Sequence, residues 1–157
     1  MRLGQFFRIH IAFIGALGLA VTLPVALSAQ ATPAGFWNTI SDTDHRPTAV
    51  VEIREANGEY SGVVRALLVP AEPADSICGK CSGARKNQRI IGMEILRHMR
   101  PAGDEWSGGE ILDPENGKTY RAKMKLAEGG TKLLVRGYIG WSLFGRTQTW
   151  IRRTNEK

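Results

Sequence analysis

The chain has 157 residues and a formal net charge of +6, with 43% of its residues hydrophobic and 23% charged. This length allows one domain with a single hydrophobic core. The basic residues are scattered along alternating segments rather than gathered in one patch, which argues against a nucleic-acid-binding protein. An ordinary solvated surface explains the positive charge more simply than attraction to anionic envelope lipid or polymer.

Residues 1–31 have the pattern of a secretory signal peptide. A positively charged start precedes a nearly continuous apolar run over residues 11–27, and small residues follow it. These small residues predict cleavage near Ala29 or Ala31. We therefore expect export to the periplasm and a single mature domain over residues 32–157. Its net charge is +4, because the removed segment carries two arginines and no acidic residue.

An uncleaved membrane anchor is the alternative interpretation of the same segment. The apolar run is barely long enough to cross ~30 Å of hydrocarbon, and Pro24 interrupts it. Cleavage is therefore the favoured prediction. No later stretch of the sequence is apolar enough to span a membrane, so we expect no transmembrane span in the mature chain.

Short runs of alternating apolar and polar residues, separated by turn residues, follow from residue 35 onward. Such alternation indicates half-buried strands. Asn57-Gly58 and Asn116-Gly117 mark tight turns, because these residue types accept the positive φ that such turns require. No stretch of a dozen residues has a sustained helical period. The predicted strands cover residues 35–39, 48–55, 60–69, 90–99, 105–113, 118–126, 131–139 and 146–153.

Eight antiparallel strands in sequence order are enough to close an up-and-down barrel. We therefore predict an all-β fold in which the first strand meets the last. A barrel of this size is either filled by its own side chains or holds one small ligand.

Residues 70–88 interrupt the strand pattern with prolines, glycines, basic residues and both cysteines. A loop of this length in a compact domain is usually functional or mobile. In an exported protein, Cys78 and Cys81 most simply form a disulfide that rigidifies the loop. A redox-active or free thiol pair is the alternative, since Lys80 and Lys86 would lower the pKa of a nearby thiol.

A metal site is a third interpretation of the cysteine pair. Zinc would need two more ligands, and the histidines outside the signal segment, His45 and His98, lack finger-like spacing. The turn containing Asp42 and Asp44 is more simply a solvated polar connection. Neither paired carboxylates suited to hydrolysis nor a nucleophile motif is present, so we predict no catalytic residue, no metal and no cofactor.

Aromatic side chains on the predicted strands are the candidates for a ligand site. Inward-facing rings would line a cavity that is apolar in bulk with a few polar tips, or they would simply fill the interior. Arg136 shares a face with Leu134 on alternation, and an inward guanidinium would need a carboxylate such as Glu52 or Glu110, or an acidic ligand head-group. The predicted ligand-binding residues are Tyr60, Trp106, Tyr120, Arg136, Tyr138 and Trp150.

The connection at residues 140–145 is unusually apolar. Trp141, Leu143 and Phe144 would be costly to leave in water, so we expect them to pack down and cap one end of the barrel. The alternative is a lip that touches lipid or a partner protein.

Several motifs resemble those of a family of small exported bacterial proteins, the domain of unknown function 2147. The resemblance extends over nearly the whole mature chain and implies a lipocalin-like barrel in the cell envelope. It transfers no catalytic residue, because no reaction is established for the family. The matching motifs are Gly35-x-Trp37, Cys78-x-x-Cys81-x-Gly83-x-x-Lys86, Ile91-Gly92, Trp106-x-Gly-Gly109 and the segments 111–120, 134–140 and 143–152.

A second resemblance is to lipocalins (calycins) and fatty-acid-binding proteins generally. Those barrels pair a Gly-x-Trp on the first strand with an arginine on the last, stacked across the closed end. Trp37 matches the first half of this pair, and Arg152, two residues after Trp150, is the candidate for the second. The resemblance therefore implies that Trp37 and Arg152 close the barrel, through a contact that contributes about 0.5–2 kcal/mol.

The sequence as a whole favours non-catalytic binding or carriage of a small apolar or amphipathic ligand. Two alternatives stay open. One is an envelope interaction protein with a filled barrel that acts through its basic cysteine loop or its apolar 140–145 connection. The other is a thiol-redox role for Cys78 and Cys81. The oligomeric state is not indicated by the sequence.

Overall fold

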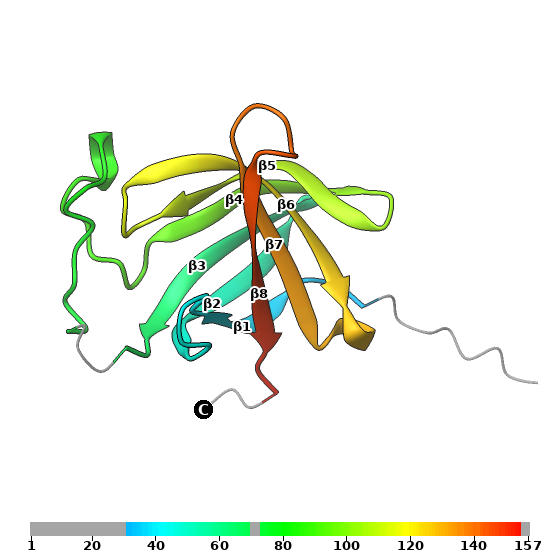
Figure 1. The fold of residues 1–157 in the computed structure, drawn as a ribbon, viewed down its shortest axis with the longest axis horizontal. Coiled ribbons are helices and arrows are strands. Elements are labelled where there is room, and N and C mark those ends of the chain that lie inside the picture. Colours follow the sequence, from blue (N-terminus) through cyan, green and yellow to red (C-terminus); the bar gives the residue numbers. More distant parts are fainter. Residues whose placement is uncertain (1–30, 70–72, 155–157) are drawn as a thin grey trace, which may run out of the picture.

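The computed structural model describes residues 31–69 and 73–154. The predicted signal peptide lies outside these residues except for its last position. Eight strands form one closed barrel in which each strand pairs antiparallel with the next and the last pairs with the first (Figure 1). The strands are β1 (Gly35–Ile40), β2 (Pro47–Ala56), β3 (Glu59–Leu67), β4 (Glu94–Ala102), β5 (Glu105–Asp113), β6 (Lys118–Ala127), β7 (Lys132–Tyr138) and β8 (Gly145–Arg152).

The barrel confirms the predicted all-β, up-and-down architecture. Its closure is made by β1 and β8, where Trp37, Asn38 and Thr39 lie opposite Arg152, Ile151 and Trp150. Two short 3₁₀ turns, at Gly83–Arg85 and Glu128–Gly130, interrupt the connections. Within the part of the chain that the structure describes, no helix has the length and apolarity needed to cross a membrane.

The fourth strand begins and ends later than predicted. Residues 90–93 form a turn in which the backbone N–H of Gly92 donates to the carbonyl oxygen of Val64 and that of Ile90 to the carbonyl oxygen of Ser76. The first bond ties the long connection to β3 and the second closes the connection on itself, so neither extends β4. At its other end, β4 continues through Pro101, so the predicted turn shortens to the two residues between Ala102 and Glu105.

Glycines let β4 and β5 approach closely where the barrel curls. Gly108 has a φ of +78°, and a Cβ on Gly109 would lie 2.2 Å from the carbonyl oxygen of Arg97. Glycine at position 108 accepts the positive φ without strain, and glycine at position 109 leaves room for the Arg97 carbonyl oxygen. The Gly108-Gly109 pair therefore allows β5 to bend where it packs closely on β4.

The two ends of the barrel differ. The strand order puts the N-terminal segment and the β2–β3, β4–β5 and β6–β7 turns at one end, which we call the closed end. The other end, which we call the mouth, carries residues 41–46, 68–69, 73–93, 114–117 and 139–144. Tightly buried side chains fill the closed half: Trp37, Val51, Ile53, Leu96, Met99, Met124, Leu133 and Trp150.

Candidate functional site

The closed end is sealed by Trp37 and Arg152. The guanidinium carbon of Arg152 lies 4.2 Å from the centroid of the fully buried Trp37 ring, so the contact implied by the lipocalin resemblance is present. Arg152 also donates hydrogen bonds to the carbonyl oxygens of Gly130 (2.6 Å), Ala34 (2.9 Å) and Thr32 (2.7 Å). Burial lowers the pKa of the Arg152 guanidinium, which still stays charged because its pKa is very high to begin with.

Cys78 and Cys81 are joined by a disulfide in the long connection at the mouth. The connection's residues 73–93, which we call the cysteine segment, are held together by the Ile77–Arg89 bridge and by a hydrogen bond from Lys86 Nζ to the carbonyl oxygen of Gly79. Both half-cystines are buried, with exposed fractions of 0% and 3%. Burial of both sulfurs favours the structural interpretation over the redox one, because an exchange partner could not reach them.

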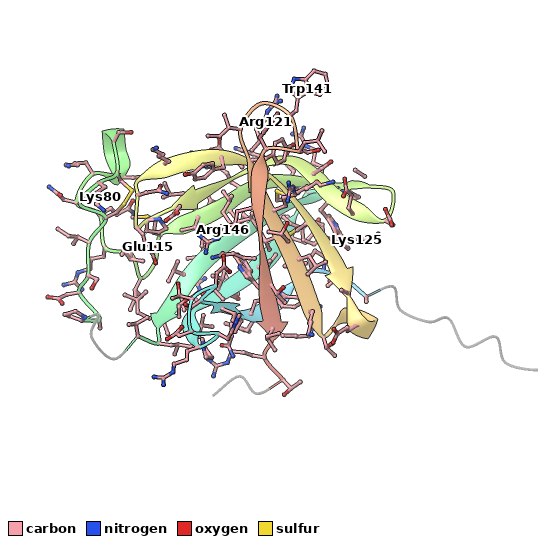
Figure 2. The ribbon with its side chains drawn as sticks, in the orientation of Figure 1. Lys80, Glu115, Arg121, Lys125, Trp141 and Arg146 are labelled. Atoms are coloured by element: carbon pink, nitrogen blue, oxygen red, sulfur yellow. A yellow bond between two sulfur atoms is a disulfide. The ribbon has the colours of Figure 1, made fainter. Side chains whose placement is uncertain are left out.

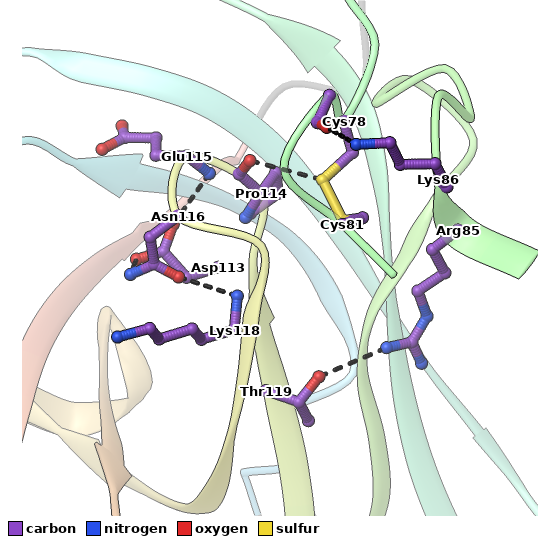
Figure 3. Close-up of a disulfide and its surroundings, with 11 residues drawn as sticks. Cys78, Cys81, Arg85, Lys86, Asp113, Pro114, Glu115, Asn116, Lys118 and Thr119 are labelled. Carbon is purple, nitrogen blue, oxygen red and sulfur yellow. Dashed lines mark hydrogen bonds between the residues drawn. A yellow bond between two sulfur atoms is a disulfide. The ribbon is translucent and has the colours of Figure 1, made fainter. Parts of the chain in front are cut away.

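The disulfide packs on the turn between β5 and β6 (Figure 3). Cys78 Sγ lies 3.3 Å from the carbonyl oxygen of Pro114, and Arg85 Nη1 donates to Thr119 Oγ1 at 3.4 Å. A Cβ on Gly117 would lie 2.1 Å from the carbonyl oxygen of Lys80. Two of the motifs that the sequence singles out, the Cys-x-x-Cys and the Asp113–Gly117 turn, are therefore one docked unit.

A cavity of about 820 Å³ opens at the mouth. Its floor is apolar and comes from inward positions of the strands, including Val64, Ile95, Leu112, Val135 and Trp150. The four mouth connections form its rim, which contributes Asp42, Lys80, Asn116 and Phe144 among others. Small inward residues, Ala49 and Gly137, leave the space open. The barrel is therefore filled at its closed end and hollow at its mouth.

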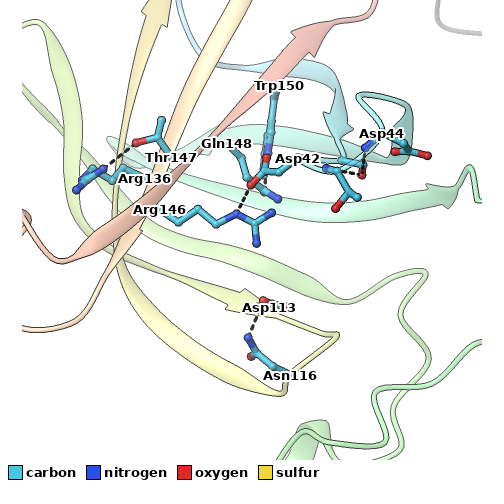
Figure 4. A network of polar contacts seen from close by, with 11 residues as sticks. Asp42, Asp44, Asp113, Asn116, Arg136, Arg146, Thr147, Gln148 and Trp150 are labelled. Atoms are coloured by element: carbon cyan, nitrogen blue, oxygen red, sulfur yellow. Dashed lines mark hydrogen bonds and ion pairs between the residues drawn. The ribbon is translucent and has the colours of Figure 1, made fainter.

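The rim of the cavity carries an organised set of polar groups (Figure 4). The Nε of Arg146 donates to Oδ2 of Asp42 across the gap between β8 and the β1–β2 connection. Asn116 Nδ2 donates to Asp113 Oδ2 at 2.7 Å and lies 3.0 Å from the Tyr120 hydroxyl. These side chains can offer hydrogen bonds to a polar group at the mouth.

Three of the predicted ligand-binding residues border the cavity, namely Tyr120, Tyr138 and Trp150. Trp150 is buried in the floor, and its Nε1 lies 3.4 Å from Gln148 Oε1. Tyr138, at the end of β7, borders both the cavity and an outer hollow that also contains Arg121 and Trp141.

Tyr60 and Trp106 do not reach the cavity. Their rings meet edge to face, with centroids 5.8 Å apart, and pack against the core toward the closed end. They match the alternative that the sequence left open for the aromatic residues, which is to fill the interior.

Arg136 lies on the outside of the barrel, which corrects its predicted inward placement. Its guanidinium donates to the carbonyl oxygens of Ser142 and Leu143 and to Thr147 Oγ1. The carboxylates suggested as its partners are bound to other arginines, Glu52 to Arg54 and Arg65, and Glu110 to Arg97. Residues 133–135 are all apolar, so alternation alone fits either face.

The apolar connection at the mouth is exposed rather than packed down, which corrects a second prediction. Residues 139–144, which we call the apolar loop, join β7 to β8. Ile139, Trp141, Leu143 and Phe144 have exposed fractions of 66% to 83%. In Figure 2, Trp141 lies at the far tip of this loop.

The polar residues of the rim were not selected from the sequence. Asp42, Lys80, Asn116, Arg146 and Gln148 come from four separate parts of the chain. The sequence could have identified Arg146 as a candidate, because strand alternation puts it on the same inward face of β8 as Gln148 and Trp150. Among the described residues, no three histidine, cysteine, aspartate or glutamate side chains gather as a metal site would require.

Comparisons with known proteins agree with this architecture. A family model described as "Uncharacterized protein conserved in bacteria (DUF2147)" matches residues 35–152. A solved structure of protein HP1028 from the human pathogen Helicobacter pylori, described as belonging to the lipocalin family, is similar with a TM-score of 0.67. It is 20% identical, and the match covers 78% of this chain and 84% of that one. A comparison with curated proteins finds no match. The chain's barrel is thus lipocalin-like.

Proposed function

We propose that this chain, which belongs to the DUF2147 family of uncharacterised proteins conserved in bacteria, binds a small, partly apolar molecule in its barrel without acting on it catalytically. The observation that carries the proposal is the cavity of about 820 Å³ with an apolar floor and a polar rim. This volume is within the range of roughly 300–1,000 Å³ typical of ligand pockets. A single amphipathic molecule matches this arrangement, with its apolar part on the floor and its polar part at the rim.

The apolar part of the ligand would lie against Val64, Leu112 and Val135, and its polar part would lie at the rim. Arg146 is already paired with Asp42. This pairing favours a neutral or zwitterionic polar group over a bare anion, since an anion would have to displace the Asp42 carboxylate. The role first considered for Arg136 thus passes to Arg146 and Asn116, with Tyr120, Tyr138 and Trp150 as neighbours of the bound molecule.

The make-up of the cavity supports binding of an amphipathic molecule. Its floor offers aliphatic side chains and Trp150 for apolar contact, as the lining of ligand pockets usually does. The periplasm is the compartment we propose for this binding. The predicted signal peptide supports it, and the Cys78–Cys81 disulfide is compatible with an oxidising compartment.

Native mass spectrometry tests the proposal on protein purified from the periplasm without detergent. We expect a reproducible extra mass that disappears when the same sample is denatured. A bare mass, even after incubation with an extract of envelope lipids, would overturn the proposal.

A variant that fills the cavity sharpens this test. Ala49 lines the cavity and is only partly buried, so Ala49→Leu adds carbon atoms to empty space. We expect this variant to lose the extra mass while keeping its melting temperature. The matched control is Ala102→Leu, which makes the same change at an exposed position beside the β4–β5 turn. Retention of the ligand by Ala49→Leu would place the bound molecule elsewhere.

A further inference from the structure

The apolar loop is the largest exposed apolar feature among the described residues. Four of its six residues are Ile139, Trp141, Leu143 and Phe144, each more than 60% exposed. Exposed apolar patches of this kind mark interaction sites. Figure 1 shows the loop between β7 and β8 standing clear of the barrel, so its tip is convex and free on several sides.

The loop is held in this exposed position by the barrel itself. Arg136 on β7 donates to the carbonyl oxygens of Ser142 at 2.8 Å and of Leu143 at 3.1 Å. The backbone N–H of Phe144 donates to the carbonyl oxygen of Trp141, and that of Ile139 to the carbonyl oxygen of Phe144. These bonds pair the carbonyl oxygens of residues 141–144, which lowers the number of unpaired polar groups that would leave water together with the loop's apolar side chains.

Two arginines, Arg121 and Arg136, lie beside the loop, which contains no acidic residue of its own. Arg121 and Tyr138 share a hollow with Trp141 at the base of the loop, and Figure 2 shows Arg121 beneath Trp141. Glu110, which lies opposite Arg121 in the sheet, is paired with Arg97 at 2.8 Å. Within the described residues, Arg121 makes no ion pair, so its charge is available to an external anion.

We propose that the apolar loop docks the mouth of the barrel on an anionic lipid bilayer. Trp141, Leu143 and Phe144 would enter the interfacial region, and Arg121 would meet lipid phosphates in the hollow it shares with Tyr138. Tryptophan and tyrosine prefer this depth of the bilayer, and basic side chains beside an apolar insertion are attracted to anionic lipid.

The shape of the loop favours a bilayer over a protein partner. A stable protein interface buries about 800 Å² on each side and needs a complementary surface. A single projecting loop offers neither, whereas a fluid interface accommodates a convex tip without complementarity. Ile139 and Phe144 also line the cavity, so docking by this loop would bring the mouth against the membrane surface.

Vesicle flotation and tryptophan fluorescence test the proposal with full-length mature protein. Two vesicle types are compared, one of phosphatidylglycerol with phosphatidylethanolamine and one of phosphatidylcholine alone. Three of the four tryptophans, Trp37, Trp106 and Trp150, are buried or half-buried, so Trp141 reports on the loop. We expect co-flotation and a blue-shifted emission with the anionic vesicles, and markedly weaker binding to phosphatidylcholine.

Single substitutions separate the apolar from the electrostatic contribution. Leu143→Ser keeps the Trp141 reporter and should weaken binding roughly tenfold, because it removes one of the inserted side chains. Arg121→Gln should weaken binding to anionic vesicles roughly fivefold. The controls are Ala102→Ser and Arg54→Gln, two substitutions at exposed residues of the closed end, away from the mouth. Both controls should bind as the wild type does.

Three results would overturn the proposal. The first is absence of binding to either vesicle, and the second is equal binding of wild type and Leu143→Ser. The third is a concentration-dependent dimer that Leu143→Ser abolishes, which would assign the loop to a second copy of this chain. Ala49→Leu should bind vesicles normally, so failure of the ligand proposal and failure of membrane docking are distinguishable.

Discussion

The backbone of Lys80 occupies the space that a side chain at Gly117 would need. A Cβ at position 117 would lie 2.1 Å from the Lys80 carbonyl oxygen and 2.7 Å from the backbone nitrogen of Cys81. Gly117 also has a φ of +73°, which glycine adopts without strain. Its position thus serves two purposes, closing the β5–β6 turn and admitting the disulfide-bonded segment onto it.

Gly117→Ala should therefore loosen the cysteine segment from the barrel. The added methyl group cannot share space with the Lys80 backbone, so either the turn or the segment must move. We expect a loss of about 1–3 kcal/mol in the free energy of unfolding beyond the cost of the positive φ alone. Urea unfolding measures this loss, and limited proteolysis should show faster cleavage within residues 73–93.

Gly58→Ala is the matched control for that variant. Gly58 has a φ of +79° in the β2–β3 turn, and a Cβ there would meet nothing within 4 Å. This change imposes the same backbone strain, worth about 1–2 kcal/mol, without a steric clash. If the two variants lost equal stability, the docking of Lys80 on Gly117 would contribute nothing.

The disulfide should stabilise the fold modestly. Cys78 and Cys81 are only three positions apart. A disulfide that closes so short a loop restricts the unfolded chain little and should stabilise the folded state by about 2 kcal/mol. Replacing both cysteines with alanine should lower the free energy of unfolding by that order and leave ligand and vesicle binding intact. A double variant as stable as the wild type, together with a reduced form holding a thiol of lowered pKa, would instead support the redox alternative.

Turn chemistry made the barrel predictable from sequence. Asn57-Gly58 and Asn116-Gly117 mark positions where only a few residue types accept the backbone conformation of a tight turn. The segments on either side of each turn can therefore be predicted as strands. On β6, apolar residues alternate with charged ones from residue 121 to 126, and the structure has Ala122 and Met124 of that apolar set buried. The Trp37–Arg152 contact came from resemblance to lipocalins, since nothing local connects residues so far apart.

The polar site was not predictable for two physical reasons. On β7 three consecutive apolar residues make both faces acceptable, so the inward assignment of Arg136 was wrong by one position. The rim pair Asp42–Arg146 joins segments 104 positions apart, and no local pattern reveals such a contact. Apolar loops usually pack against the rest of the protein, and the exposed Trp141 does not follow this tendency. Departures of this kind from the rules that favour stability are common at functional surfaces.

Among the partly exposed residues of the closed end, Arg152 should be the one whose substitution lowers the free energy of unfolding most. Arg152→Lys keeps the positive charge but loses the planar group that lies over Trp37 and donates to three carbonyl oxygens. We expect the free energy of unfolding to fall by about 2–4 kcal/mol, since hydrogen bonds from a charged donor are strong. Chemical denaturation measures the change. Arg121→Lys is the control and should be nearly neutral, because Arg121 is exposed on β6 and makes no ion pair among the described residues.

Acid should weaken the fold partly through Glu52. Hydrogen bonds from Arg54 above all, and also from Arg65, hold the pKa of the Glu52 carboxyl below its ordinary value of 4.5, against the opposing effect of burial. A carboxyl with a lowered folded-state pKa binds protons more readily in the unfolded chain. Its stabilising contribution is therefore fully present above pH 4.5 and is lost as the pH falls through the folded-state pKa.

Glu52→Gln should flatten the dependence of stability on pH below pH 4.5, because the glutamine cannot titrate. At neutral pH the same variant should be less stable than the wild type, since Arg54 and Arg65 lose their shared carboxylate. Urea unfolding midpoints between pH 3 and 7 measure both effects. Glu94→Gln is the control, because Glu94 is exposed at the start of β4 and makes no ion pair among the described residues. Parallel pH profiles for wild type and Glu52→Gln would show that the Arg54–Glu52–Arg65 cluster does not contribute to stability.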